Sequence, residues 1–376
     1  MKYRLNTPLL TNIETKFAVD VLKSGWISVG GKYNKLFERK FGKIINKKYN
    51  LLVQSGTAAL HLALKAININ KNDAVITPNF SCSANINCIS QCGAKAIVVE
   101  SEKDTLGLDF ELVKKAILKF KPKALQLVHV YGFPARDTIK IVKLCKKKNV
   151  IVIEDASEAL GAKINGKMVG SFGDISIFSL RSEKMIGVGE GGIISTKSKS
   201  NFSAIDLIAS RNMPFRKRKN EYWKKYISNG EGYNYTMPHI LAAIGLGQLK
   251  KLNYIVNRKR EIGKIYRKEM KDFSFAQKLI KGFKPVYWLN HIYLPEFSET
   301  KVKALGKYLM KNDIEVRSGF WPLINTKGVR KVLVSGESKL SNNLFKKILI
   351  LPSNLKLKKT DIKFIKYKIN TFIKKK

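Results

Sequence analysis

The chain has 376 residues, of which 44% are hydrophobic and 10% aromatic, and this composition excludes a wholly disordered protein. At about 150 residues per domain, the length corresponds to two or three domains. No apolar run approaches the roughly 18 residues of a membrane-spanning helix, and the first residues lack the apolar stretch of a signal peptide. The four cysteines show neither a disulfide framework nor a zinc-binding spacing. We therefore expect a cytoplasmic protein without a transmembrane segment or a metal site.

The charge of the chain is strongly positive. Lys and Arg number 71 against 28 Asp and Glu, which gives a formal net charge of +43. Such an excess predicts attraction to polyanions or to substrates that carry phosphate. The basic residues are spread along the whole chain, and the sequence contains no zinc finger or RNA-recognition motif. We therefore expect no specific nucleic-acid partner, although a basic protein that binds nucleic acid or anionic surfaces remains the non-enzymatic alternative.

Short apolar runs and helical stretches alternate along the first two thirds of the chain. Helical patterns cover residues 58–66 and 139–148. The predicted strands are residues 51–54, 74–77, 94–100, 124–130, 150–154, 174–180 and 191–196. Several of these runs are continuously apolar, as expected of strands that are covered on both faces. The alternation predicts an α/β fold with a mostly parallel central sheet wrapped by helices.

The last part of the chain has a different pattern. A helical stretch runs from about residue 238 to 271, and the strands predicted at 288–296 and 314–318 lie among Lys-rich amphipathic helices. This pattern predicts a smaller C-terminal α+β domain. We therefore divide the chain into a large domain, residues 1–250, and a small domain, residues 251–376.

Ligands of open parallel sheets bind beyond the carboxyl ends of the strands, so the residues that follow each strand are the first candidates for a site. Ser55, Gly56 and Thr57 follow the first strand and begin a helix, whose free N–H groups suit a phosphate. The same residues also suit an ordinary helix cap. Asp155 follows the fifth strand, where a buried acid requires a partner.

Lys184 follows the next predicted strand, five positions after Ser179. A lysine that forms a Schiff base needs a rigid position at a strand end and partial desolvation. A pyridoxal phosphate (PLP) site also needs an acid for the pyridine nitrogen and a cradle for the phosphate. The sequence offers the cradle, the acid and the lysine in that order.

At this point the sequence resembles the DegT/DnrJ/EryC1/StrS aminotransferases, which are PLP-dependent sugar aminotransferases with the type I aminotransferase fold. The resemblance covers nearly the whole chain. The matching blocks are LKSGWIS (22–28), SGTAALHLAL (55–64), TPNF (77–80), VHVYGFP (128–134), IEDASEALGA (153–162), VGSFGDISIFSL (169–180) with Lys184, GEGG (189–192), GYNYTM (232–237), LAAIGLGQL (241–249) and LPS (351–353).

The resemblance implies a role for each matching residue. Lys184 is implied to be the Schiff-base lysine and proton carrier, and Asp155 the partner of the pyridinium nitrogen. Gly56, Thr57 and Ser179 are implied to hold the cofactor phosphate.

Two further positions bear on assembly and on subfamily. Asn234 is implied to reach the phosphate bound by a neighbouring subunit, so that active sites are shared in a homodimer. Glu158 occupies a position beside the cofactor hydroxyl where most members have Gln and perosamine-synthase-like members have Glu.

Other positions depart from the family or carry weaker assignments. Cys82 stands where an aromatic residue usually stacks on the cofactor ring. The segment 317–326 lacks the histidine of the family's C-terminal pattern, but its Arg317 and Trp321 remain candidate substrate contacts. Trp26 and His129 are further substrate candidates from matching blocks.

The resemblance therefore implies amino transfer from glutamate to a nucleotide-linked keto-sugar, which would make an amino sugar for surface polysaccharide. Glu158 and the YW pair at 222–223 favour GDP-4-keto-6-deoxymannose as acceptor and GDP-perosamine as product. A UDP- or dTDP-linked keto-sugar or a keto-sugar acid remains open as acceptor. A PLP-dependent sugar dehydratase is the alternative reaction, although such relatives replace the lysine by histidine.

Overall fold

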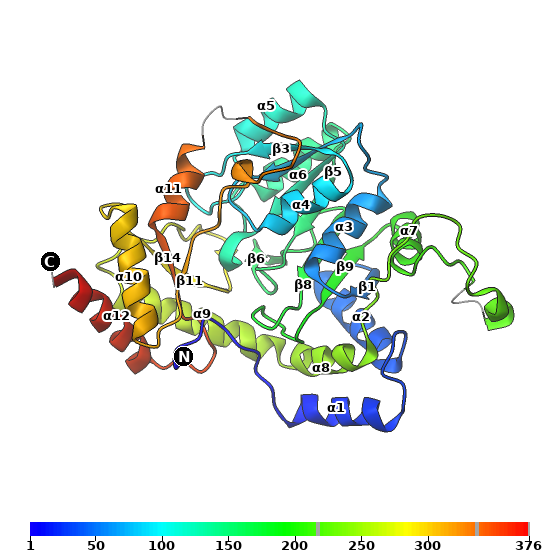
Figure 1. The fold of residues 1–376 in the computed structure, drawn as a ribbon, viewed down its shortest axis with the longest axis horizontal. Helices are drawn as coiled ribbons and strands as arrows, with labels where there is room; N and C mark the ends of the chain where they lie inside the picture. The colour runs from blue at the N-terminus through cyan, green and yellow to red at the C-terminus, as the bar shows by residue number, and fades with distance from the viewer. Residues whose placement is uncertain (216–218, 335–337, 375–376) are drawn as a thin grey trace.

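The computed structural model describes residues 1–215, 219–334 and 338–374. Within these residues the main sheet has eight strands in the order β1-β9-β8-β5-β4-β2-β3-β13. Their bounds are β1 Tyr49–Val53, β2 Ala74–Pro78, β3 Lys95–Val99, β4 Ala124–Val128, β5 Ile151–Asp155, β8 Ile175–Ser179, β9 Gly192–Thr196 and β13 Lys331–Leu333. All neighbours are parallel except at β9, which runs antiparallel to both β1 and β8. The mostly parallel α/β sheet that the sequence predicts is therefore present (Figure 1).

Helices cover both faces of this sheet. Because successive strand residues point to opposite sides, neighbouring residues of one strand pack against different helices. Val75 packs in the cluster that includes side chains of α3 and α4, whereas Ile76 packs in the cluster that includes α5 and α6. The helices of the first 250 residues are α1 Asn12–Lys23, α2 Lys32–Ile45, α3 Gly56–Ala66, α4 Ser83–Gln91, α5 Phe110–Phe120, α6 Thr138–Lys147, α7 Lys199–Ala209 and α8 His239–Lys250. Short 3₁₀ turns are η1 Val130–Gly132, η2 Lys219–Lys224 and η3 Leu323–Asn325.

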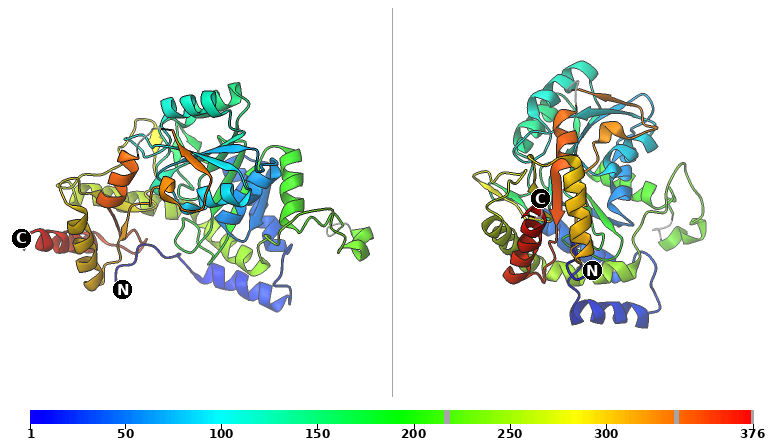
Figure 2. Two further views of the ribbon diagram at one scale, coloured as in Figure 1. Left: turned by 45° about the horizontal axis from the view of Figure 1, so that its top comes forward. Right: turned by 60° about the vertical axis from the view of Figure 1, so that its left-hand side comes forward.

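The C-terminal part forms its own apolar cluster around a three-stranded antiparallel sheet in the order β11-β14-β12. Its elements are α9 Leu252–Glu269, β11 Asn290–Tyr293, α10 Glu299–Lys311, β12 Arg317–Ser318, α11 Lys339–Lys347, β14 Ile348–Leu351 and α12 Lys359–Lys374. A second small sheet joins β6 Lys163–Ile164, β7 Lys167–Met168 and β10 Phe283–Lys284. Helices α10 and α12 lie at one end of the molecule, and η2 projects from the opposite end (Figures 1 and 2).

The structure corrects three details of the sequence prediction. The helix predicted over 238–271 is two helices, because the regular backbone is interrupted at Lys251. The strands predicted at 288–296 and 314–318 are shorter, and each pairs with β14 only over a few residues. Strand β13 from the C-terminal part joins the edge of the main sheet beside β3. The domain division near residue 250 stays a prediction.

Candidate active site

A cavity of about 690 Å³ opens at the carboxyl ends of the strands of the main sheet. Its sheet-side wall consists of residues that follow or end β1, β2, β4, β5 and β8. Its opposite wall comes from residues 288–289, 317–321 and 350 of the C-terminal part. The cavity therefore lies where the carboxyl-end rule for parallel sheets places a ligand site.

The turn from β1 into α3 forms one end of the cavity. Ser55 caps α3, and its hydroxyl accepts a hydrogen bond from the Ala58 N–H at 3.0 Å. Gly56 packs against the end of β8, where an added Cβ would come within 3.0 Å of the Ser179 Cβ. Thr57 and Ser179 also line the cavity. These residues therefore bring a helix N-terminus and hydroxyl groups together, an arrangement that suits a phosphate.

Asp155 ends β5 and is only 5% exposed. The Asn85 side chain donates a hydrogen bond to its Oδ2 at 2.9 Å, and the Ser157 N–H donates to Oδ1 at 3.0 Å. Asn85 is itself held by the Ser81 hydroxyl, which donates to the Asn85 Oδ1 at 2.7 Å. The carboxylate is thus fixed in one orientation on the cavity wall.

Lys184 lies in the tight loop between β8 and β9. Its backbone N–H donates to the Arg181 carbonyl at 2.8 Å, and the Ser182 N–H donates to the Gly189 carbonyl at 2.9 Å. The Lys184 Nζ lies in the cavity, 3.5 Å from the Glu158 Oε1. The same nitrogen is 3.6 Å from the centroid of the Trp288 ring. An amine in this position combines the rigid placement and partial desolvation that Schiff-base chemistry requires.

Glu158 is almost fully buried beside the lysine. Its Oε2 accepts a hydrogen bond from the Tyr131 N–H at 2.8 Å. Tyr131 has a φ of 53°, a left-handed conformation that is rare for a bulky aromatic residue. Burial raises the pKa of the Glu158 carboxyl, and the Lys184 charge opposes this shift. The strained backbone at Tyr131 thus aims an N–H group at a carboxyl that faces the lysine.

Cys82 lines the same cavity as the N-cap of α4. Its side chain is exposed to the cavity, yet the protein atoms around it raise the pKa of the thiol. The aromatic side chains that line the cavity are instead Tyr131, Trp288, Phe320 and Trp321, and the ring centroids of Tyr131 and Phe320 lie 5.0 Å apart in a stacked arrangement. The aromatic side chains of the site therefore come from positions other than residue 82.

His129 does not line the cavity. It is fully buried, its Nε2 faces the Glu154 Oε1 at 3.1 Å, and its Nδ1 accepts from the Ala135 N–H at 2.9 Å. Glu154 also accepts from the Phe172 and Gly173 N–H groups at 2.8 and 2.7 Å. Despite burial, these bonds lower the pKa of Glu154 to about 2. The structure thus places His129 in a buried network behind the site.

Four more sequence candidates divide into two pairs. Arg317 and Trp321 line the cavity, and Arg317 also forms ion pairs with Glu183 and Glu315 at 3.1 and 3.2 Å. Trp26 is 55% exposed, and Asn234 is also exposed; neither lines this cavity.

Sequence reasoning missed Asn85, Trp288 and Tyr131. Asn85 lies one helical turn from Cys82, and this spacing is the only signal that could have placed it at the cavity. Trp288 precedes β11, far along the chain from the lysine that it contacts. Such contacts follow from tertiary packing and leave no local pattern.

The fold and the cavity define an enzyme class. A lysine in a hydrogen-bonded loop after β8, a fixed carboxylate and a turn that suits a phosphate lie in one cavity, and PLP chemistry requires these three features. Comparison with known proteins agrees with this class. Residues 9–370 match the model of the DegT/DnrJ/EryC1/StrS aminotransferase family, and the chain belongs to this family.

Individual relatives extend the comparison. GDP-perosamine synthases of Vibrio cholerae and Escherichia coli O157:H7 are each 38% identical, over 84% and 86% of both chains respectively. A solved GDP-4-keto-6-deoxymannose-3-dehydratase has a TM-score of 0.88 at 24% identity, with 98% of this chain and 100% of that chain covered. At that identity the likeness shows the fold alone. The predictions of the fold class, of an aminotransferase and of a PLP cofactor are confirmed.

Proposed function

We propose that this protein transfers an amino group from glutamate to GDP-4-keto-6-deoxymannose and so forms GDP-perosamine. The observation that carries the proposal is the Lys184 amine, which lies between Glu158 and Trp288 in the cavity that also holds Asp155. The curated relatives at 38% identity support the choice of substrate. The acceptor is a phosphate-bearing sugar, which suits a strongly basic chain.

The residues of the cavity fit PLP. Gly56, Thr57 and Ser179 would hold the phosphate, Asp155 the ring nitrogen and Lys184 the aldehyde carbon. When bound, PLP supplies an electron sink for the carbon that loses or gains a proton. Cys82 also lines this cavity and presents a thiol where the family resemblance leads us to expect an aromatic residue.

The side chains of this protein then carry out proton transfer and orientation. Lys184 would move the proton between the cofactor carbon and the substrate carbon, because its amine lies in the cavity, 3.5 Å from the Glu158 carboxyl. Asp155 keeps its orientation through Asn85 and Ser157. Glu158 places a buried carboxyl 3.5 Å from the Lys184 Nζ, and burial raises the pKa of this carboxyl while the lysine charge opposes the shift.

A homodimer belongs to the proposal. Asn234 is exposed and lies outside the cavity of its own chain, as a residue that serves a neighbouring site would. Exposed apolar side chains gather in α1 and its following loop and near η2, at Leu22, Trp26, Ile27, Trp223 and Tyr226. Surfaces of this kind mark contacts with another chain.

The setting of the enzyme is proposed to be cytoplasmic. All four cysteines are free, as expected in a reducing compartment. Among the residues that the structure describes, no helix is both long and apolar enough to cross a membrane.

Product analysis tests the proposal. The protein is incubated with PLP, glutamate and GDP-4-keto-6-deoxymannose, and the nucleotide sugars are identified by mass spectrometry and NMR. We expect a 4-amino sugar and one equivalent of 2-oxoglutarate for each sugar converted. A deoxy sugar without a new amino group would overturn amino transfer in favour of dehydration. Conversion only of UDP- or dTDP-linked keto-sugars would overturn the choice of nucleotide.

A further inference from the structure

Trp288 makes two separate contacts with the loop that carries Lys184. The face of its indole covers the Lys184 Nζ, 3.6 Å from the ring centroid. Its Nε1 donates a hydrogen bond to the Glu183 carbonyl at 2.6 Å. Trp288 is only 4% exposed, and the Lys184 side chain is 13% exposed. One side chain therefore contacts the lysine amine and the backbone immediately before it.

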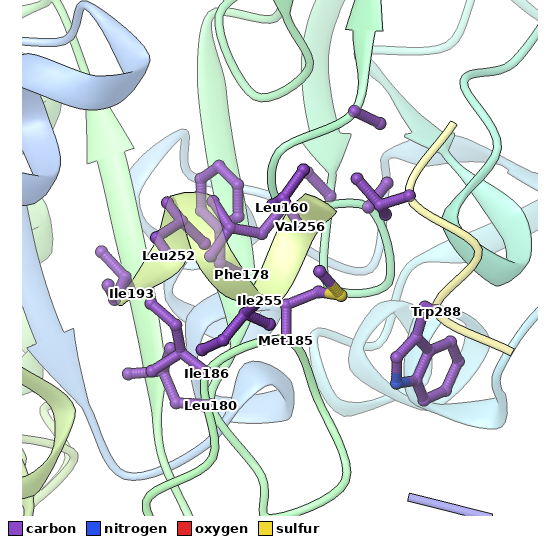
Figure 3. Close-up of a cluster of buried hydrophobic side chains, with 14 of the residues drawn as sticks. Leu160, Phe178, Leu180, Met185, Ile186, Ile193, Leu252, Ile255, Val256 and Trp288 are labelled. Carbon is purple, nitrogen blue, oxygen red and sulfur yellow. The ribbon is translucent and has the colours of Figure 1, made fainter. Parts of the chain in front are cut away.

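The loop is anchored on both sides of Lys184. The Glu183 carbonyl also accepts a hydrogen bond from the Asn6 side chain at 2.6 Å. On the other side, Met185 and Ile186 are buried in the cluster with α9, and Trp288 lies at the edge of this cluster (Figure 3). The backbone on both sides of Lys184 is thus held by hydrogen bonds and by apolar packing.

The indole restricts that side chain. A Lys ammonium is attracted to the face of an indole, and the attraction is strongest where water is excluded. Glu158 holds the same nitrogen from another direction at 3.5 Å. An amine with two fixed neighbours loses fewer degrees of freedom when it reacts.

Trp288 is itself held by a buried lysine. The Lys259 Nζ donates to the Trp288 carbonyl at 3.0 Å, to the Ser353 carbonyl at 2.6 Å and to the Asn6 Oδ1 at 3.1 Å. Lys259 is 1% exposed. Asn6 therefore contacts both the lysine that supports Trp288 and the carbonyl that Trp288 binds.

We propose that Trp288 is a positioning residue for Lys184, acting through its indole face and its N–H group. The inference rests on the proposed role of Lys184 as the reacting amine. It also assigns to the C-terminal part of the chain a function in the chemical step, in addition to lining the cavity. Lys259 and Asn6 support this residue from behind.

The test measures the chemical reactivity of Lys184 in the full-length protein without cofactor. Acetic anhydride labels the lysines, and mass spectrometry compares the labelling rate of Lys184 with that of exposed lysines. W288L removes the face and the N–H, whereas W288F keeps an aromatic face and loses only the N–H. W321L is the matched control, because Trp321 lines the same cavity and its indole packs against Phe345.

We expect W288L to label Lys184 at least fivefold faster than the unmodified protein, W288F about two- to threefold faster, and W321L at the unmodified rate. In the loaded enzyme, W288L should lower kcat at least tenfold, and W288F should recover part of the loss. If W288L does not fold, W288F decides the question. Unchanged labelling in every folded Trp288 variant, or an equal increase in W321L, would overturn the proposal. Because labelling needs no cofactor or substrate, it tests the role of Trp288 even if the protein does not catalyse the proposed amino transfer.

Discussion

The two walls of the cavity differ in how firmly their side chains are held. On the sheet side, Asp155 and Glu158 are each 5% exposed, and protein donors fix both carboxyl groups. On the C-terminal side, the Arg317 side chain is 49% exposed and Trp321 is 53% exposed. The rigid wall suits steps that are the same for every substrate, and the accessible wall suits the choice of sugar. Trp288, Leu289 and Ile350 differ from these two residues, since they come from the C-terminal part and are buried.

The charge of the cavity lining differs from the charge of the whole chain. The positively charged residues that line it are Arg181, Lys184 and Arg317, and the acidic ones are Asp155, Glu158, Glu183 and Glu190. The two sets are nearly balanced, whereas the whole chain carries a formal charge of +43. The cavity therefore does not concentrate the positive charge, and long-range attraction of a phosphate-bearing substrate comes from the rest of the surface.

Removal of the lysine should have the largest effect. K184A is expected to lower amino transfer by more than about a thousandfold, because both covalent attachment and proton transfer depend on this amine. Circular dichroism should show an unchanged fold. K148A, at the exposed C-cap of α6, is the matched control and should keep full activity. Amino transfer by K184A near the unmodified rate would contradict the assignment.

Removal of the Asp155 carboxylate should have the second largest effect on activity. D155A is expected to lower kcat by roughly a hundred- to a thousandfold, as for the loss of one preorganised electrostatic partner. N85A should cost about tenfold, because it removes one of the two donors that orient the same carboxylate. Steady-state kinetics measure both effects. A larger loss in N85A than in D155A would show that the orientation argument is wrong.

The accessible wall should affect binding of the sugar selectively. R317A is expected to raise the KM for the nucleotide sugar about tenfold, which corresponds to one charge-assisted hydrogen bond. The half-reaction with glutamate should change less than about twofold, because the rigid wall is intact. An equal loss of activity in both half-reactions would show that the two walls do not have separate roles.

The phosphate cradle should respond to a single methyl group. G56A places a Cβ 3.0 Å from the Ser179 Cβ, so one of the two segments must move. We expect the affinity for PLP to fall about tenfold, equivalent to about 1.4 kcal/mol. G306A is the control, because the nearest atom to its Cβ would be 3.8 Å away in the C-terminal part. Absorbance titration with PLP measures both affinities.

The smallest expected effect concerns acid stability. Burial lowers the pKa of His291 from 6.5 to about 3. A depressed pKa means that the unfolded chain binds the proton more readily, so stability is fully present above about pH 6.5 and is lost as the pH falls toward 3. When the pH falls from 8 to 5.5, the free energy of unfolding should therefore decrease by about 1 kcal/mol less in H291F than in the unmodified protein. Urea unfolding at the two pH values measures this difference, and identical losses would contradict it.

Much of the fold and part of the site could be predicted from the sequence. Continuous apolar runs marked seven strands of the main sheet, and the carboxyl-end rule placed Gly56, Asp155 and Lys184 in one cavity. Strand β13 escaped prediction because a three-residue edge strand has too little pattern. Trp288 escaped because its role depends on packing against a distant loop. Local chemistry could thus be read from the chain, but the closure of the cavity by the C-terminal part could not.

The visible absorption spectrum of the protein with PLP tests most directly whether Lys184 is the reacting amine. We expect a band that requires Lys184, disappears when glutamate is added and returns when GDP-4-keto-6-deoxymannose follows. K184A should lack the lysine-dependent band. A protein without this band, or a K184A variant with the same spectrum and the same response to glutamate, would show that Lys184 is not the reacting amine of an aminotransferase.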